Sequence, residues 1–243
     1  MRALYSLWCW TVGVVLTLVF GTLAILTSWL PPRGRTYLFW ARRWARSIVF
    51  LIGMPLRAEV APEAASTRAA ILMSNHESIL DILALLAAIP QDVRFLAKRS
   101  LFHIPVLGWS MALGGFIPVD RDRTDGAREV LEALEARLKG GVSVLIFPEG
   151  TRSRDGSLQP FKKSGFLLAL RTGMPILPVG ISGAHGFLAR GALALTRRPL
   201  TLRIGPPIPT DGLGVSRRAE LMERVRAAIL TQTGRGDASR PAA

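Results

Sequence analysis

A polar turn between two strongly apolar segments constrains the fold of this chain more than any other feature. Residues 69–73 form an apolar run that predicts a buried strand, and residues 82–89 predict a helix that ends before Pro90. The turn between them covers residues 74–81. A polar turn after a buried strand lies at the edge of a sheet, where open α/β proteins carry their functional residues. The sequence therefore predicts an α/β fold with a site at this edge.

The turn contains a histidine followed five residues later by an aspartate. His76 belongs to the residue type best suited to move a proton near neutral pH. If the helix begins at Ser78, Asp81 falls in its first turn and can reach one imidazole nitrogen, which leaves the other facing a substrate. The alternative is that Ser78 and Asp81 form a capping box, in which Asp81 only caps the helix. This segment alone leaves both interpretations open.

The charge balance of the chain indicates an anionic partner. Its 243 residues include 31 Lys and Arg against 17 Asp and Glu, which gives a net charge of +14. Such a charge favours either nucleic acid or an anionic membrane surface as the partner. Hydrophobic residues make up 49% of the chain and the mean hydropathy is +0.32, which is high for a purely soluble protein. The single cysteine, Cys9, excludes an intramolecular disulfide and a cysteine cluster for zinc or iron–sulfur.

An uncharged apolar segment near the N-terminus predicts a membrane anchor. Residues 3–30 contain no charged side chain, and this length is sufficient for a helix that crosses a bilayer with some tilt. Trp8, Trp10 and Trp29 lie near its ends, where indole rings favour the membrane interface. A cleaved signal peptide would have a shorter apolar core and a small-residue cleavage site, which this segment lacks. We therefore expect a retained anchor.

A second segment, residues 37–54, mixes arginines with aromatic and aliphatic residues. It is too short to span a bilayer alone and suits an interfacial or re-entrant helix. Arginines are concentrated after residue 32, against Arg2 alone on the other flank, so the positive-inside rule places the arginine-rich side in the cytoplasm. The two helices form either a hairpin in one leaflet or a true span, and the sequence leaves this open.

Apolar strands alternate with helical segments along the rest of the chain. Further strands are expected at residues 93–97, 114–121, 142–147, 175–181 and 200–204, and helices at 125–139, 162–172 and 216–231. This alternation predicts an α/β fold with a mixed, partly parallel sheet flanked by helices. We divide the chain into an anchor at 1–56, a globular domain at 57–233 and a disordered tail at 234–243.

Three of the predicted strands end in polar turns, after Met73, Val119 and Phe147. If these strands are neighbours in one sheet, their turns meet at one edge and gather His76, Asp81, Arg121, Glu149, Gly150, Thr151 and Arg152. Guanidinium groups hold a phosphate by paired hydrogen bonds, and a Gly-Thr turn adds backbone N–H groups and a hydroxyl. A histidine beside such a site can take a proton from a hydroxyl of a phosphate-bearing substrate, which then attacks an activated acyl group.

Several basic residues have an equally good explanation as surface charge. Lys98 follows a predicted strand and is a candidate for phosphate or donor binding, and Lys162 and Lys163 are similar candidates. Taken singly, Arg121 and Arg152 are also consistent with exposed charge, which a chain of +14 has in plenty. Pro118 predicts that its strand is an edge or bulged strand, because proline cannot donate to a central ladder.

Four sequence blocks resemble, in order and spacing, the motifs of the glycerolipid acyltransferases, the family that acylates glycerol-3-phosphate or 1-acylglycerol-3-phosphate. The blocks are residues 75–81, 115–121, 147–153 and 176–179. The first and third match in full and are the most specific. The resemblance covers about residues 71–181. The length and the N-terminal anchor are most similar to those of the bacterial 1-acylglycerol-3-phosphate acyltransferases.

This resemblance implies a set of roles for the globular domain. His76 would be the general base with Asp81 as its partner, and Arg121 with residues 149–152 would hold the glycerol phosphate. The acyl donor would be acyl-CoA or acyl-carrier protein, with no metal, no cofactor and no acyl-enzyme. The product would be phosphatidic acid, formed at the cytoplasmic side of a bacterial inner membrane beside anionic lipids.

Two rival functions remain consistent with the sequence. The first keeps the chemistry but acylates another lysolipid, such as the lyso form of ornithine lipid. The second is a non-catalytic cationic protein that coats an anionic membrane; it explains the anchor and the charge but not the His76–Asp81 turn. A nucleic-acid binder is disfavoured, because the basic residues are spread along the chain behind a membrane segment.

Overall fold

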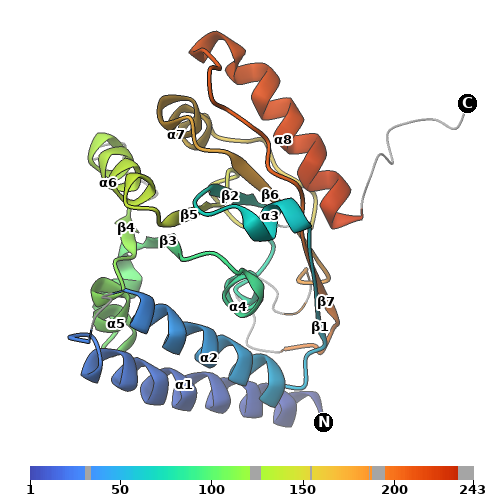
Figure 1. Cartoon of the computed structure of the whole chain (residues 1–243). Coiled ribbons are helices and arrows are strands. Elements are labelled where there is room, and N and C mark those ends of the chain that lie inside the picture. The colour runs from blue at the N-terminus through green and yellow to red at the C-terminus, as the bar shows by residue number, and fades with distance from the viewer. Residues whose placement is uncertain (31–33, 121–126, 154, 186, 188–194, 235–243) are drawn as a thin grey trace, which may run out of the picture.

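The fold is built on a single mixed sheet. The structure, a computed structural model, describes residues 1–30, 34–120, 127–153, 155–185, 187 and 195–234, so Arg121 and the tail beyond residue 234 lie outside it. Within these residues the strands are β1 (Leu56–Val60), β2 (Ile71–Ser74), β3 (Val93–Lys98), β4 (Ile117–Val119), β5 (Ser143–Ile146), β6 (Ile176–Ser182) and β7 (Leu200–Ile204). Their order across the sheet is β1-β7-β6-β2-β5-β3-β4 (Figure 1).

The sheet is mostly parallel, as the alternation of strands and helices predicts. β6, β2, β5, β3 and β4 pair in parallel, whereas β7 is antiparallel to β6 and parallel to β1. β4 lies at the edge, in agreement with Pro118. The expectation that the strands ending near residues 73, 119 and 147 are neighbours holds only for β2 and β5, because β3 separates β4 from them. Their carboxyl ends still point to the same side of the sheet.

Strict alternation of side chains divides the core into two layers. Leu72 and Leu145 face one layer, while Ile71, Met73, Val144 and Ile146 face the other. Both faces are therefore buried, which explains the continuous apolar runs in these strands. Figure 1 shows α6, α7 and α8 covering one face, and α4 with the N-terminal helices covering the other.

Most of the helices follow the predicted positions to within a few residues, but the two short ones at Pro62–Ser66 and Leu107–Leu113 were not predicted. They are α1 (Arg2–Leu26), α2 (Arg35–Leu51), α3 (Pro62–Ser66), α4 (Leu80–Ala88), α5 (Leu107–Leu113), α6 (Ala127–Lys139), α7 (Ser164–Thr172) and α8 (Arg218–Thr233), with short 3-10 turns at Arg99–His103 and Val215–Arg217. α7 ends at Gly173, whose φ of 66° is the left-handed conformation that favours glycine at a helix terminus.

α1 and α2 form a hairpin that lies along the globular domain. By length and composition α1 is able to cross a membrane. Its first turn nevertheless contacts the domain, since Arg2 donates to Thr196 at 2.6 Å and the Ser6 hydroxyl accepts from the Leu195 N–H at 2.9 Å. Near its other end, Gly21 approaches Val106 beside α5. Both ends of α1 therefore contact the globular domain (Figure 1).

The close packing of α8 on β6 depends on Gly180. A Cβ at this position would lie 2.3 Å from the carbonyl carbon of Gln232 and 2.4 Å from the backbone nitrogen of Thr233. Because backbone cannot move aside cheaply, we expect Gly180→Ala to lower the free energy of unfolding by about 1–3 kcal/mol or more in denaturant titration. Gly214→Ala is the control, since its nearest neighbour would be the Ser216 hydroxyl at 3.6 Å. Equal stability of the two variants would contradict this packing.

Candidate active site

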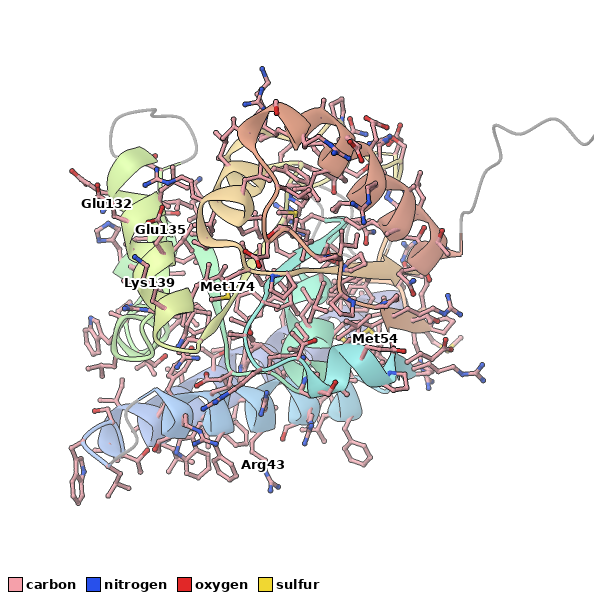
Figure 2. The ribbon with its side chains drawn as sticks, turned by 45° about the horizontal axis from the view of Figure 1, so that its top comes forward. Arg43, Met54, Glu132, Glu135, Lys139 and Met174 are labelled. Atoms are coloured by element: carbon pink, nitrogen blue, oxygen red, sulfur yellow. The ribbon has the colours of Figure 1, made fainter. Side chains whose placement is uncertain are left out.

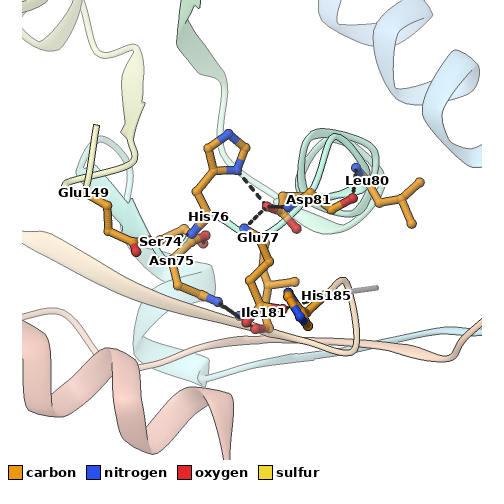
Figure 3. A network of polar contacts seen from close by, with 10 residues as sticks. Ser74, Asn75, His76, Glu77, Leu80, Asp81, Glu149, Ile181 and His185 are labelled. Atoms are coloured by element: carbon orange, nitrogen blue, oxygen red, sulfur yellow. Dashed lines mark hydrogen bonds and ion pairs between the residues drawn. The ribbon is translucent and has the colours of Figure 1, made fainter. Parts of the chain in front are cut away.

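The local sequence explains why a functional turn forms after β2. The apolar run ends at Ser74, and α4 begins at Leu80 with Ile79 as its N-cap residue. Asp81 lies in the first turn of α4, as predicted. His76 remains in the connecting loop, at the carboxyl edge of the sheet (Figure 3). The helix thus brings the aspartate back toward the histidine.

His76 and Asp81 form a buried pair. The distance from His76 Nδ1 to Asp81 Oδ2 is 2.7 Å, and the two residues are 6% and 0% exposed. The same Oδ2 accepts the backbone N–H groups of Glu77 at 2.7 Å and Ser78 at 2.8 Å. Both predicted roles of Asp81 are therefore present in the structure. The same oxygen accepts backbone N–H groups at the start of the helix, as a cap does, and also binds the imidazole.

A third contact fixes the plane of the imidazole. The Phe147 ring stacks on His76 with a centroid separation of 3.9 Å and an interplanar angle of 15°. With Nδ1 donating to the carboxylate, the neutral ring carries its lone pair on Nε2, on the side away from Asp81 (Figure 3). This orientation is the one that the predicted role of His76 as a general base requires. The stacking partner is not evident from the sequence, because Phe147 belongs to a different strand connection.

Glu149 joins the loop after β5 to the His76–Asp81 turn. Its Oε1 accepts the His76 N–H at 2.7 Å, and its Oε2 accepts the Gln159 N–H at 2.8 Å. The His76 carbonyl in turn accepts the Ser153 N–H at 2.7 Å. The sequence predicted Glu149 as a substrate ligand. In the structure its carboxylate contacts backbone amides and so positions both loops, and its contact with a substrate stays a prediction.

The turn that follows Glu149 presents its side chains at the surface. Gly150 has a φ of 73°, which requires glycine, and its N–H donates to the Phe147 carbonyl at 3.0 Å. Thr151 and Arg152 are exposed, and among the described residues no carboxylate pairs with Arg152. Arg152 precedes Ser153, which is bonded to His76. The turn therefore places a guanidinium without a described ion-pair partner next to the loop that carries His76.

The structure describes all three lysines that were predicted as candidates for binding. Lys98 is exposed at the carboxyl end of β3, between the ends of β5 and β4. Lys162 covers the Gly150 turn, since its side chain occupies the space a Cβ at Gly150 would take. Lys163 is exposed just before α7. Binding by these lysines stays a prediction.

Asn75 and Glu77 attach the His76–Asp81 turn to β6. The Asn75 amide bridges Ile181, donating to its carbonyl and accepting from its N–H, both at 2.8 Å. Glu77 accepts from Asn75 at 3.2 Å and from the His185 N–H at 2.9 Å (Figure 3). These bonds satisfy backbone groups at the point where β6 leaves the sheet. The turn is consequently held on both sides, by β5 and by β6.

A residue outside the predicted site supports the loop from α8. Arg226 donates to the carbonyls of Leu158 at 2.9 Å and Gln159 at 3.1 Å, and its guanidinium lies 5.6 Å from the centre of the Phe161 ring. Because the Gln159 N–H is bonded to Glu149, α8 helps to fix the loop that contacts His76. No local sequence pattern identifies Arg226, which lies far along the chain.

The buried position of Glu149 makes the stability of the fold depend on pH. Burial raises the pKa of Glu149 from 4.5 to about 7, although hydrogen bonds from Gln159 and His76 oppose the rise. The folded state thus binds the proton more tightly than the unfolded chain, so this contribution is complete below pH 4.5 and is lost as the pH rises toward 7.

Replacing Glu149 by glutamine should remove this dependence. We expect the unfolding free energy of the wild type to fall by at most about 3 kcal/mol relative to Glu149→Gln between pH 4.5 and 7, as measured by denaturant titration. Glu223→Gln, on the exposed surface of α8, is the matched control. Parallel pH profiles for wild type and Glu149→Gln would exclude a perturbed carboxyl at this position.

Comparison with known proteins places this arrangement in a family. The Acyltransferase family model matches residues 57–182, which include the whole His76–Asp81 turn and the Glu149–Arg152 turn. The chain therefore belongs to the acyltransferase family. Its mixed, mostly parallel sheet and N-terminal helices also match a solved member. That structure is the 1-acyl-sn-glycerophosphate (LPA) acyltransferase PlsC from Thermotoga maritima, with a TM-score of 0.83, 25% identity, and coverage of 99% of this chain and 98% of that one.

Curated relatives carry the same description. The chain is 34% identical over 185 residues to human 1-acyl-sn-glycerol-3-phosphate acyltransferase alpha, covering 76% of this chain and 65% of that protein. It is 32% identical over 235 residues to the human beta protein, covering 94% of this chain and 81% of that protein. The chain thus spans slightly less than two thirds of the human alpha relative. The match to the beta protein extends across almost the entire chain.

Proposed function

We propose that this protein transfers a fatty acyl group from a thioester donor to the free hydroxyl of 1-acyl-sn-glycerol-3-phosphate, giving phosphatidic acid. The observation that carries the proposal is the buried His76–Asp81 pair, beside a turn that presents Arg152. This combination supplies a base for a hydroxyl and a cation for a phosphate on the same edge of the sheet. The names of the relatives support the same acceptor.

The chemistry requires one proton transfer and one acyl transfer. Nε2 of His76 removes the proton from the acceptor hydroxyl as the oxygen attacks the thioester carbonyl carbon. A C–O bond forms, the C–S bond breaks, and the thiol of CoA or of acyl-carrier protein leaves with the proton. Asp81 stabilises the imidazolium that forms in between. Positioning of the two substrates supplies the remainder of the acceleration.

The N-terminal hairpin suggests how the site reaches its lipid substrate. Both ends of α1 contact the globular domain, so we propose that α1 and α2 enter one leaflet and do not cross the bilayer. α1 exposes large apolar side chains such as Leu7, Val15 and Leu18. The arginines of α2 favour the cytoplasmic leaflet of a bacterial inner membrane. The lysolipid then enters from the bilayer and the donor from the cytoplasm.

An acceptor panel tests the proposed substrate. Purified protein and labelled acyl-CoA are offered lysophosphatidate, glycerol-3-phosphate or lyso-ornithine lipid in parallel, and the set is repeated with acyl-carrier protein as the donor. We expect lysophosphatidate to give the highest kcat/KM. A preference for lyso-ornithine lipid would retain the reaction class and replace the acceptor.

Arg152 provides a specific test of phosphate recognition. Because a charge-assisted hydrogen bond contributes about 1.5–3 kcal/mol, Arg152→Ala should raise the KM for lysophosphatidate by about 10- to 100-fold and change kcat little. Arg224→Ala is the control, since it removes the same charge from an exposed position on α8. An unchanged KM in Arg152→Ala would show that the phosphate is bound elsewhere.

A further inference from the structure

A second concentration of positive charge lies far from the His76 pair. A cavity of about 350 Å³ opens between α2 and the segment that links α4 to β3. We call it the arginine cavity, and its lining includes Arg35, Phe39, Arg42, Arg43, Arg46 and Asp92. Four arginines against one aspartate give these residues a formal charge of +3. The cavity adjoins the carboxyl end of α4, whereas Asp81 lies in the first turn of that helix, so it is separate from the catalytic centre.

Backbone carbonyls hold Arg42 and Arg46, and among the described residues no carboxylate forms an ion pair with any of the four cavity arginines. Nη2 of Arg42 donates to the carbonyls of Ile89, Pro90 and Gln91 at 2.7–2.9 Å. Nε of Arg46 donates to the Ala87 carbonyl at 3.0 Å. Asp92, the acidic residue of the lining, is already paired with the buried Arg94. Like charges that lack counter-charges repel each other, and an anion bound between them removes that cost.

The cavity also lies where a membrane headgroup would be. Phe39 and Phe50 are exposed on the same face of α2, at helical spacing from the arginines. Arg43 lies 5.1 Å from the centre of the Phe39 ring and points away from the globular domain (Figure 2). The opposite face of α2 packs on the core through Ala45, Ile48 and other apolar residues. This alternation of arginine and phenylalanine matches the boundary between headgroups and acyl chains.

We propose that the arginine cavity binds the phosphate of an anionic phospholipid headgroup. Planar guanidinium groups from Arg35 and Arg43 suit a phosphodiester, and Phe39 contacts the first carbons of the acyl chains. The site would anchor the hairpin at a fixed depth in the leaflet, next to a catalytic centre that takes its substrate from the same membrane. This proposal rests on the proposed association with a membrane, but it does not require any step of acyl transfer.

Vesicle binding without an acyl donor tests the site. Full-length protein is titrated with phosphatidylcholine vesicles that contain or lack phosphatidylglycerol. We expect Arg35→Gln/Arg43→Gln to weaken binding to the anionic vesicles by about 10- to 30-fold and to leave binding to neutral vesicles unchanged. Arg218→Gln/Arg224→Gln on α8 removes the same charge and should change the affinity less than about twofold. Equal affinities of wild type and the α2 double variant would overturn the proposal.

A charge-conserving variant separates a defined site from general attraction. Arg35→Lys/Arg43→Lys keeps the charge but loses the paired N–H groups, so a defined site predicts at least about fivefold weaker binding to anionic vesicles. Wild-type affinity in this variant would overturn the site and leave only a diffuse charge effect. Inorganic phosphate is the second arm: a defined phosphate site predicts release of the vesicles by phosphate but not by chloride at equal ionic strength, and equal release by both anions would overturn it. Because the assay measures binding and not turnover, its result tests the cavity even if the protein proves inactive as an acyltransferase.

Discussion

Replacing His76 by alanine should reduce kcat for acyl transfer by about 10³-fold or more, while lysolipid binding survives. General base assistance contributes about 10²–10⁴-fold, and Nε2 of His76 has no substitute among the described residues of this turn. His76 also stacks on Phe147, so the substitution removes packing as well. The thermal midpoint of the variant is therefore measured alongside its kcat, and the rate is compared at a temperature where both proteins are folded.

A second histidine supplies the matched control. His103 is exposed at the end of a 3-10 turn and has no ion pair with a carboxylate among the residues described. His103→Ala should retain kcat to within about twofold. If His76→Ala turns over at the wild-type rate, His76 is not the base. Turnover by both proteins would retain the acyl-transfer reaction and assign its base to another group.

Asp81→Asn should reduce kcat by about 10²–10³-fold and also destabilise the fold. An asparagine oxygen can still accept the Glu77 and Ser78 N–H groups, but it carries no charge to stabilise the imidazolium. Its NH₂ group would then take the place of Asp81 Oδ1, a buried atom with no hydrogen-bond partner in the structure. A buried unsatisfied donor costs about 1–3 kcal/mol, and this loss should appear in denaturant titration.

The two effects separate the catalytic role of Asp81 from its capping role. If Asp81 only capped α4, Asp81→Asn would lose stability yet keep kcat per folded molecule. Glu63→Gln is the control, because Glu63 lies in the first turn of α3 and does not contact the site. Near-wild-type kcat in folded Asp81→Asn would contradict the proposed pairing. A large loss of kcat at full occupancy of the folded state would support it.

Much of the fold is predictable because its central strands are buried on both faces. β2 and β5 are short apolar runs bounded by turns, and each was expected within one or two residues of its observed position. β1 was not predicted, because three of its five residues are exposed and its sequence lacks an apolar run. The insertion of β3 between β5 and β4 was also missed. Strand order is set by crossover connections, which no local pattern encodes.

The candidate site was predictable where its contacts are local in sequence. His76 and Asp81 are five residues apart, and a loop followed by a first helical turn brings them to 2.7 Å. The contacts of Glu149 and Arg226 are different, because they join segments more than 60 residues apart and use backbone atoms that any residue carries. Because the partners are backbone atoms, the types of the residues do not predict such bonds. Arg121 lies outside the described residues, so its part in phosphate binding remains a prediction.

The most direct test of the central claim is acyl transfer from labelled acyl-CoA or acyl-carrier protein to lysophosphatidate by the purified wild-type protein. The account predicts labelled phosphatidic acid and one equivalent of free thiol per product, with no label left on the protein. Absence of labelled phosphatidic acid with both donors would contradict the proposed function. Label covalently retained on the protein would contradict direct transfer through a His76 base.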